Sequence, residues 1–181
     1  MSDHASLLLP SPWVCRWAPL IPAGGRVLDV AAGDGRHARY LAAMGYAVEA
    51  VDRDAEALAR AAAPGIATRQ ADLERDPWPY AGAAFQGIVV CNYLWRPLLA
   101  PMVAALAPGG VLIYETFAAG NERYGRPSNP DFLLQPGELL EAVRGRLQVV
   151  AFEQGEVTRP KPAVVQRICA VNGAGGLPLA A

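Results

Sequence analysis

One stretch of the sequence decides the fold: Arg26-Val-Leu-Asp-Val-Ala-Ala-Gly-Asp-Gly-Arg-His-Ala-Arg-Tyr40. Its apolar start predicts a buried strand over 26–30, and Gly33 and Gly35 predict a tight turn into a helix. A second strand, over 46–51, ends at Asp52. These elements form the first half of a nucleotide-binding βαβ unit, in which the glycines let backbone N–H groups approach a ligand and the acid binds ribose hydroxyls.

The charges around this turn indicate which nucleotide it binds. The segment Gly33-Asp-Gly-Arg-His-Ala38 matches the dinucleotide pattern G-x-G-x-x-G/A, and Asp52 follows at a suitable distance. However, Asp29 and Asp34 place carboxylates beside a helix N-terminus that would have to attract a pyrophosphate anion. A ligand with an ammonium and a sulfonium suits this turn better, and S-adenosylmethionine carries both and no phosphate.

Further segments in the same order resemble the motifs of the class I S-adenosylmethionine-dependent methyltransferases, and the resemblance spans residues 11–171. The matching segments are 27–35 (motif I), 48–52 (the second motif), 70–73, 85–93 and 106–115. The segments 115–117 and 129–133 also resemble a small bacterial branch that is similar to tellurite-resistance methyltransferases. The resemblance implies the fold, the cofactor and a methyl-transfer reaction.

The order of the predicted elements points to the same fold. Strands alternate with helices, which is typical of a doubly wound parallel sheet, and the last two strands have no helix between them, which implies an antiparallel strand. We therefore expect an α/β, Rossmann-like, doubly wound, seven-stranded, mostly parallel sheet with one antiparallel strand near the C-terminus. The expected strands are 26–30, 46–51, 66–69, 85–91, 110–116, 146–153 and 162–171. The expected helices are 12–19, 35–44, 97–106, 136–144 and one that starts after Asp52 or Asp54 and runs through Arg60.

We expect residues 1–181 to form a single methyltransferase domain. Within it, 1–24 is expected as an N-terminal helical lid, 117–135 as a substrate-side loop and 172–181 as a flexible tail. Trp13 and Trp17 share one face of the first helix. They either cover the cofactor or pack on the sheet, because an amphipathic face looks the same in both cases.

The resemblance also implies which residues hold the cofactor. Asp29 and the residues of the glycine turn face the methionine part, Asp52 takes the ribose hydroxyls, and Arg53 flanks the adenine. Asp72 is expected at the adenine amino group, although a turn-capping role suits it as well. Tyr93 is expected near the sulfonium, although it also suits packing at the start of a helix. The full predicted set is Asp29, Ala31, Gly33, Asp34, Gly35, Asp52, Arg53, Asp72, Leu73, Asn92 and Tyr93.

The acceptor side has candidates, but no catalytic residue is assigned. Tyr93, Glu115 and Tyr124 are candidates for contact with the acceptor or for a general base. Arg123 and Arg126, on the expected loop, indicate a small anionic acceptor. The prolines that follow the corresponding asparagine in nucleic-acid amino methyltransferases are absent after Asn92, which argues against a nucleic-acid base as the acceptor.

Composition narrows the function further. The formal net charge of −1 predicts no nucleic-acid partner, since such proteins carry a basic face. Three widely spaced cysteines without a C-x-x-C motif, and only two histidines, predict reduced thiols and no metal site. The N-terminus lacks the basic and apolar parts of a secretion signal, and no apolar run is long enough to span a bilayer. We expect a cytoplasmic protein without a membrane partner.

The predicted function is S-adenosylmethionine-dependent methyl transfer to a small-molecule acceptor by in-line displacement, with S-adenosylhomocysteine as the product. One alternative is a non-catalytic S-adenosylmethionine-binding or regulatory protein, and another is an RNA or protein methyltransferase. A nicotinamide-dependent oxidoreductase fits least well, because Asp34 opposes a pyrophosphate. The sequence does not identify the acceptor or the oligomeric state.

Overall fold

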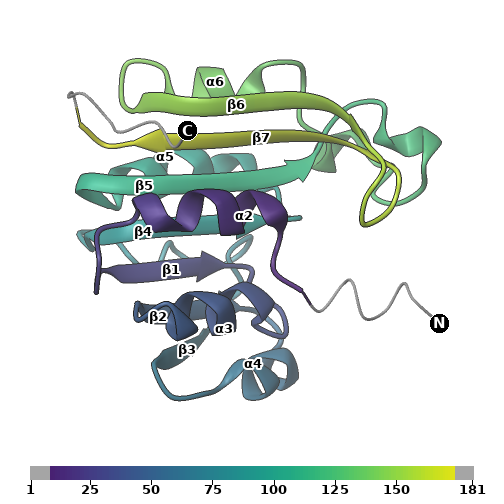
Figure 1. Cartoon of the computed structure of the whole chain (residues 1–181). Coiled ribbons are helices and arrows are strands. Elements are labelled where there is room, and N and C mark those ends of the chain that lie inside the picture. The colour runs from purple at the N-terminus through teal and green to yellow at the C-terminus, as the bar shows by residue number, and fades with distance from the viewer. Residues whose placement is uncertain (1–8, 174–181) are drawn as a thin grey trace.

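A seven-stranded sheet with the order β3-β2-β1-β4-β5-β7-β6 forms the centre of the molecule (Figure 1), in a computed structural model that describes residues 9–173. Neighbouring strands from β3 to β5 are parallel, and β7 is antiparallel to both of its neighbours, β5 and β6. The predicted seven-stranded, mostly parallel sheet with one antiparallel strand is therefore confirmed. The strands are β1 Arg26–Val30, β2 Ala47–Asp52, β3 Ile66–Gln70, β4 Phe85–Cys91, β5 Leu106–Phe117, β6 Gln148–Val157 and β7 Ala163–Val171.

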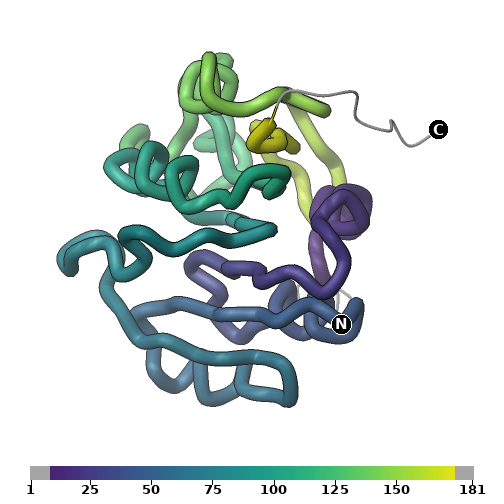
Figure 2. The backbone as a smooth tube through the Cα atoms, turned by 90° about the vertical axis from the view of Figure 1, so that its left-hand side faces the viewer, coloured from purple at the N-terminus to yellow at the C-terminus, as the bar shows by residue number. Residues whose placement is uncertain are grey.

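Helices cover both faces of the sheet, so the expected doubly wound arrangement is confirmed. In Figure 2 the purple α2 and the teal α5 lie on opposite sides of the strands. Successive side chains of a strand point to opposite faces, and accordingly Val27 packs in one core and Leu28 in the other. One face carries α2 Pro12–Trp17, α3 Arg36–Ala43 and α4 Ala55–Ala61, and the other carries α5 Leu99–Ala104 and α6 Glu138–Val143.

Two helices begin where the sequence signals place them. The Ser11 hydroxyl accepts a hydrogen bond from the Trp13 N–H at 3.1 Å, and Pro12 occupies the first position of α2. The Asp54 carboxylate accepts from the N–H groups of Glu56 and Ala57, so Asp54, and not Asp52, caps α4. Asp52 is thereby left available to a ligand.

The helix expected over 97–106 ends earlier. It consists of a 3-10 turn, η2 Arg96–Leu98, followed by α5, and β5 begins at Leu106 because Leu106 already pairs with Phe85. A methyl group on Gly110 would lie 2.8 Å from two backbone oxygens, so the strand has room for glycine only at this point. The backbone of β5 lies close to that of Phe85 here, and β5 spans Leu106–Phe117 where the sequence predicts 110–116.

The connection between β3 and β4 is a loop over 71–84, as the sequence predicts, and no helix is described there. Its aromatic side chains fill the space on that face. Trp78 packs edge-on against Tyr80, and Tyr80 packs edge-on against Phe85, with ring centroids 5.1 and 5.4 Å apart. This packing anchors the later part of the loop beside the amino end of β4, whereas Asp72 lies at the start of the loop, just after the carboxyl end of β3.

Trp13 and Trp17 are buried against the sheet, at 3% and 5% exposure, with their rings 5.7 Å apart. The Trp13 indole N–H donates to the Ile168 carbonyl of β7 at 3.3 Å. The sequence left open whether these two side chains cover the cofactor or pack on the sheet, and in the structure they pack on the sheet. Residues 1–8 of the expected lid lie outside the described residues.

The long connection after β5 is folded onto the body. It contains two 3-10 turns, η3 Asn121–Arg123 and η4 Pro130–Phe132. Asn121 is 2% exposed, and its side chain donates to the Pro127 carbonyl and accepts from the Val164 N–H. These bonds tie the segment to β7.

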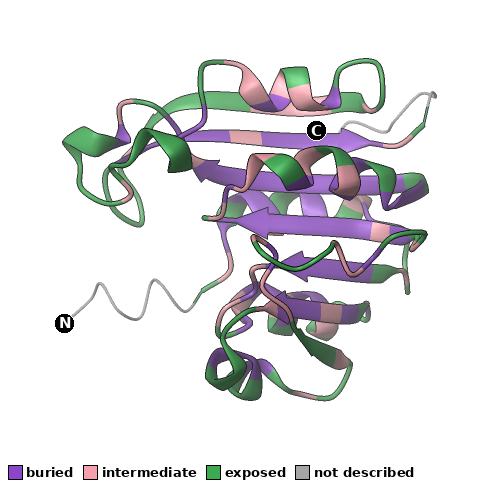
Figure 3. Ribbon diagram, turned by 180° about the vertical axis from the view of Figure 1, so that it is seen from behind, coloured by how far each residue is buried: buried purple, intermediate pink, exposed green. Residues whose placement is uncertain are grey.

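The two ends of the sheet differ from its centre. Figure 3 shows buried central strands and exposed edge strands, β3 and β6.

The expected tail begins at Asn172, whose side chain donates to the Leu106 and Ala107 carbonyls. Residues 174–181 lie outside the described residues. None of the helices in the described part has the length and apolar character that a bilayer crossing requires.

Candidate functional site

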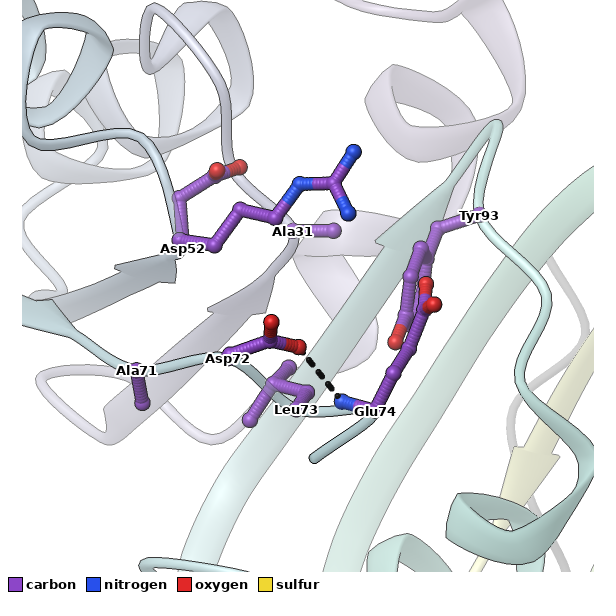
Figure 4. A pocket seen from close by; sticks show the side chains of 8 residues that line it. Ala31, Asp52, Ala71, Asp72, Leu73, Glu74 and Tyr93 are labelled. Atoms are coloured by element: carbon purple, nitrogen blue, oxygen red, sulfur yellow. Dashed lines mark hydrogen bonds between the residues drawn. The ribbon is translucent and has the colours of Figure 1, made fainter. Parts of the chain in front are cut away.

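The carboxyl edge of the sheet holds a cavity of about 250 Å³ (Figure 4). It lies where β1, β2, β3 and β4 end, which is where open α/β sheets bind ligands. Six of its lining residues belong to the predicted cofactor set, while Ala71 and Glu74 do not. The lining residues are Ala31, Asp52, Arg53, Ala71, Asp72, Leu73, Glu74 and Tyr93.

Asp52 is fixed by two backbone N–H groups. Its Oδ2 accepts from the Gly33 N–H at 2.8 Å, and its Oδ1 accepts from the Asp54 N–H at 3.0 Å. Each carboxylate oxygen has more than one acceptor position, so capacity remains for further donors. A carboxylate held in this way is preorganised to accept two hydroxyl hydrogen bonds from a ribose.

The two glycines of the turn have different surroundings. Gly33 has φ +52°, and a methyl group there would meet nothing within 4 Å, so space for a ligand lies above it. Gly35 has φ +75°, and a methyl group there would lie 2.5 Å from the Ala61 Cβ. Gly35 therefore serves the packing of α3 against α4, and Gly33 is the glycine that borders open space.

Two residues other than glycine adopt left-handed backbone conformations at this edge. Ala31 has φ 54° and directly follows β1, and Asn92 has φ 57° and directly follows β4. Such conformations cost roughly 1–3 kcal/mol and cluster at ligand sites. They mark the points at which the backbone turns away from the sheet after β1 and after β4, and Ala31 lines the cavity.

Two of the predicted acids do not line the cavity. Asp34 is exposed, and its carboxylate forms an ion pair with Arg60 on α4 at 2.8 Å. Asp29 is 1% exposed, and its Oδ2 has no hydrogen-bond partner among residues 9–173. Burial raises the pKa of Asp29 from 3.8 to about 7.

Asp72 lines the cavity and also caps a turn. Its Oδ1 accepts from the Glu74 N–H at 3.1 Å, drawn as a dashed line in Figure 4. Its own N–H donates to the Asp76 carboxylate at 3.0 Å. The two roles that the sequence left open for Asp72 are thus compatible, because the cap orients the carboxylate toward the cavity.

The Tyr93 hydroxyl is buried and has no hydrogen-bond partner in the part of the chain that the structure describes. Burial, followed by the carboxylates of Glu74 and Asp72, raises the pKa of Tyr93 well above its ordinary value of 10. The group therefore stays a neutral donor. An unpaired buried hydroxyl costs about 1–3 kcal/mol, so a ligand that accepts its proton would relieve that cost.

A second cavity, of about 200 Å³, adjoins the first. Glu74 and Tyr93 line both cavities and form the boundary between them. The remaining walls come from the end of β4, the end of β5 and the connection that follows β5. The lining residues are Glu74, Asn92, Tyr93, Leu94, Thr116, Phe117, Pro127 and Phe132.

Glu115 and Tyr124, expected near the acceptor, line neither cavity. Glu115 lies on the α2 face, where its Oε1 accepts from the Ser11 hydroxyl at 2.8 Å and its other oxygen pairs with Arg167. The next residue along β5, Thr116, faces the second cavity, because strand side chains alternate. Tyr124 is 44% exposed on the outer surface.

The two loop arginines do not line the cavities either. Arg123 forms an ion pair with Glu156 at 2.8 Å, and Arg126 is exposed. The sequence-based indication of an anionic acceptor is therefore not supported by their positions.

Sequence reasoning missed Glu74, Phe117 and Phe132. Glu74 lies only two residues after Asp72, and this spacing was the available signal for Glu74. Phe117 and Phe132 lie at the start and near the end of the predicted substrate-side loop, and their apolar character in a polar segment was the available signal.

Comparisons with known proteins point to a family of methyltransferases. The model of a methyltransferase domain matches residues 27–110, from the start of β1 into β5, and so includes every residue that lines the first cavity. This match and the solved structures below support a class I S-adenosylmethionine-dependent methyltransferase. The cofactor of this methyltransferase is S-adenosylmethionine. No curated protein matches the sequence.

Solved structures share the fold of this methyltransferase at low sequence identity. The TehB-like methyltransferase of Corynebacterium glutamicum superposes with a TM-score of 0.65 at 22% identity, over 88% of this chain and 86% of that one. TehB of Haemophilus influenzae gives 0.71 at 19% identity, over 90% of this chain and 62% of that one, so this chain spans less than two thirds of that protein. The N-methyltransferase NodS of Bradyrhizobium japonicum gives 0.68 at 18% identity, over 88% and 94%.

The residues of the first cavity suit this cofactor. Asp52 offers a preorganised acceptor for a diol, and the unpaired Tyr93 hydroxyl offers a donor. Ala31, Ala71 and Leu73 give apolar walls for a flat base. Three of the four charged lining residues are acids, which favours a ligand that carries a sulfonium and an ammonium over one that carries phosphates.

Proposed function

We propose that this methyltransferase transfers the methyl group of S-adenosylmethionine to a small-molecule acceptor in the second cavity. The observation that carries the proposal is that two adjoining cavities share Glu74 and Tyr93 as their boundary. A cofactor in one and an acceptor in the other would meet at that boundary, which is the geometry that group transfer needs.

Within the first cavity we assign roles to the lining residues. Asp52 accepts from the ribose hydroxyls, Asp72 accepts from the adenine amino group, and Arg53 flanks the base. Ala31 and Gly33 leave room for the methionine part, and Tyr93 donates its hydroxyl to the ligand. Asp29 lies beneath the turn as a buried carboxyl group whose Oδ2 has no hydrogen-bond partner among residues 9–173.

The protein does not need to activate the methyl group. S-adenosylmethionine supplies an activated methyl group on its sulfonium, and in-line displacement by the acceptor leaves S-adenosylhomocysteine. The side chains then have to align the acceptor, exclude water and surround a cation that loses its charge as the reaction proceeds. Tyr93 and the neighbouring acids provide such surroundings.

The size and charge of the site argue against the other candidate functions. A cavity of about 200 Å³ suits a small molecule. Binding to RNA would favour basic side chains, but no arginine, lysine or histidine lines this cavity among the described residues. Asp52, Asp72 and Glu74 would repel the pyrophosphate of a nicotinamide cofactor. A non-catalytic binding protein would not require a second cavity beside the methyl group. The three cysteines are free, which agrees with the cytoplasmic location that we propose.

A thermal-shift titration with S-adenosylmethionine, S-adenosylhomocysteine and NADH in parallel tests the cofactor site. At 100 times its dissociation constant a ligand adds about 2.7 kcal/mol, a shift of roughly 5–10 °C for a domain of this size. We expect this shift with the two sulfur compounds only. Asp52→Asn should lose most of it, whereas Glu141→Gln, at an exposed position of α6, should keep it. A shift with NADH alone, or none with any of the three, would overturn the proposal.

A further inference from the structure

We infer that the second cavity selects a flat, apolar acceptor that carries an amine and rejects oxyanions. This inference rests on the proposed function, because it names the class of acceptor that the same site takes. The inference rests on the apolar and aromatic side chains that line the second cavity and on the one charged residue among them.

The walls of the cavity are mainly aromatic and apolar. Phe117 comes from the end of β5, Phe132 from η4 and Tyr93 from the end of β4, so rings from three segments surround one space. Leu94 and Pro127 complete the apolar part. Phe132 is 42% exposed, so part of its ring is open to a ligand in this cavity. Such walls favour a planar ring, which stacks on aromatic side chains.

Glu74 is the only charged residue that lines this cavity among residues 9–173. Its N–H is bound to Asp72, but its carboxylate has neither a hydrogen-bond nor an ion-pair partner in the described chain. A lone carboxylate beside aromatic rings attracts an ammonium, because opposite charges at a partly exposed site attract each other more strongly than in bulk water. The aromatic faces add to the attraction of a cation.

No cation lines the second cavity among residues 9–173, and two of the nearby arginines form ion pairs elsewhere. Arg96 pairs with Glu138 at 2.6 Å, and Arg123 pairs with Glu156 at 2.8 Å. Lys161 lies over the Phe117 ring, 5.9 Å from its centroid, and does not line the cavity. Arg53 lines the first cavity and not the second. An oxyanion would therefore enter a space with one carboxylate and no cation, where its charge would lack a partner.

Glu74 also has a place in the reaction. An ammonium bound beside Glu74 would first give one proton to the Glu74 carboxylate, which frees the lone pair on nitrogen. The nitrogen would then form its bond to the methyl carbon while the carbon–sulfur bond breaks and leaves its electron pair on sulfur. Neither Glu115 nor Tyr124 is positioned for this step, because neither lines a cavity.

The test uses probes that share a phenyl ring and differ in charge: 2-phenylethylamine, 2-phenylethanol and 3-phenylpropanoate, with selenite as an inorganic oxyanion. Binding of each to the protein saturated with S-adenosylhomocysteine is measured by calorimetry. We expect the amine to bind at least about tenfold more tightly than the carboxylate, which corresponds to about 1.4 kcal/mol, and selenite not to bind. Glu74→Gln should remove the preference for the amine over the alcohol, and Phe132→Ala should weaken both. Glu141→Gln serves as the control and should change nothing.

The outcomes separate the two proposals. If S-adenosylhomocysteine itself does not bind, the proposed function fails. If it binds, but the carboxylate or selenite binds as tightly as the amine, or no phenyl probe binds, then only the inference on the acceptor is overturned. Retention of the amine preference in Glu74→Gln would likewise refute the role of Glu74.

Discussion

Glu74 and Tyr93 come from different connections, one after β3 and one after β4, and their side chains lie next to each other at the boundary of the two cavities (Figure 4). The Tyr93 backbone is held from beneath, because the hydroxyl of the fully buried Tyr114 donates to the Tyr93 carbonyl at 2.9 Å. The Tyr93 hydroxyl, by contrast, has no partner among the described residues. Tyr114 thus fixes the backbone of Tyr93, and the Tyr93 hydroxyl is left to donate a hydrogen bond to a ligand.

Replacing Tyr93 with phenylalanine separates a structural role from a binding role. The unpaired hydroxyl contributes nothing to folding, so the free energy of unfolding of Tyr93→Phe should stay unchanged or rise by up to about 1 kcal/mol. Its affinity for S-adenosylhomocysteine should fall by about tenfold, which corresponds to one lost hydrogen bond. Denaturation and calorimetry on the same preparation measure the two quantities.

Tyr114→Phe is the matched comparison. It removes a hydrogen bond that exists in the free protein, so its stability should fall by about 1 kcal/mol. If Tyr93→Phe were the less stable of the two and bound the cofactor normally, its hydroxyl would have a structural partner and our assignment would be wrong.

The glycine turn offers a second pair of variants. Gly35→Ala places a methyl group 2.5 Å from the Ala61 Cβ, at φ +75°, and should lose about 3 kcal/mol of stability. Gly33→Ala meets no atom within 4 Å and should lose only about 1 kcal/mol, from backbone strain. Urea denaturation of both variants checks the order. Equal losses would show that α3 and α4 move apart easily to accept the extra methyl group.

Much of the first cavity was predictable because its residues occupy fixed places relative to local elements. Ala31 directly follows β1, Asp52 ends β2, and Tyr93 lies just after β4. The strands themselves are recognisable from short apolar runs between glycine and proline turns. Parallel strands bring their carboxyl ends to one edge, so the order of elements already gathers these side chains.

The second cavity depended on facts that the sequence does not contain. A shift of one residue along β5 decides that Thr116 faces the cavity and Glu115 faces Ser11, and the register comes from pairing with β4 and β7. Asp34 pairs with Arg60, which is 26 residues away in the sequence, and no local sequence pattern predicts such a pair. Phe132 reaches the site through the fold of an irregular connection.

Two buried groups should give opposite dependences of stability on pH. The folded state raises the pKa of Asp29 to about 7, so its contribution to stability falls as the pH rises from about 4 to 7. Burial, aided by the charge of Arg36, lowers the pKa of His37 from 6.5 to about 3, so its contribution falls as the pH drops from about 6.5 to 3. Between pH 4 and 6.5 the two effects oppose each other.

Single substitutions should separate these effects. Relative to the unsubstituted protein, Asp29→Asn should gain stability as the pH rises from 4 to 6.5, by up to about 1.4 kcal/mol per pH unit. His37→Gln, which keeps an acceptor for the Ser11 N–H, should lose stability over the same interval. Urea denaturation at four pH values gives both slopes. Curves that run parallel to that of the unsubstituted protein would mean that neither group titrates abnormally.

Arg96 holds the wall of the second cavity. Its guanidinium binds Glu138 at 2.6 Å and donates to the carbonyls of Asp131 and Leu133, at 2.7 and 2.9 Å, on either side of Phe132. Arg96→Ala should therefore loosen the segment around Phe132, which hydrogen exchange over 129–135 would detect as faster exchange. The affinity for 2-phenylethylamine should fall by about tenfold, and that for S-adenosylhomocysteine should hardly change. Arg144→Ala removes an exposed ion pair with Glu141 on α6 and should alter neither. Equal loss of both affinities in Arg96→Ala would instead show that this arginine supports the whole carboxyl edge of the sheet.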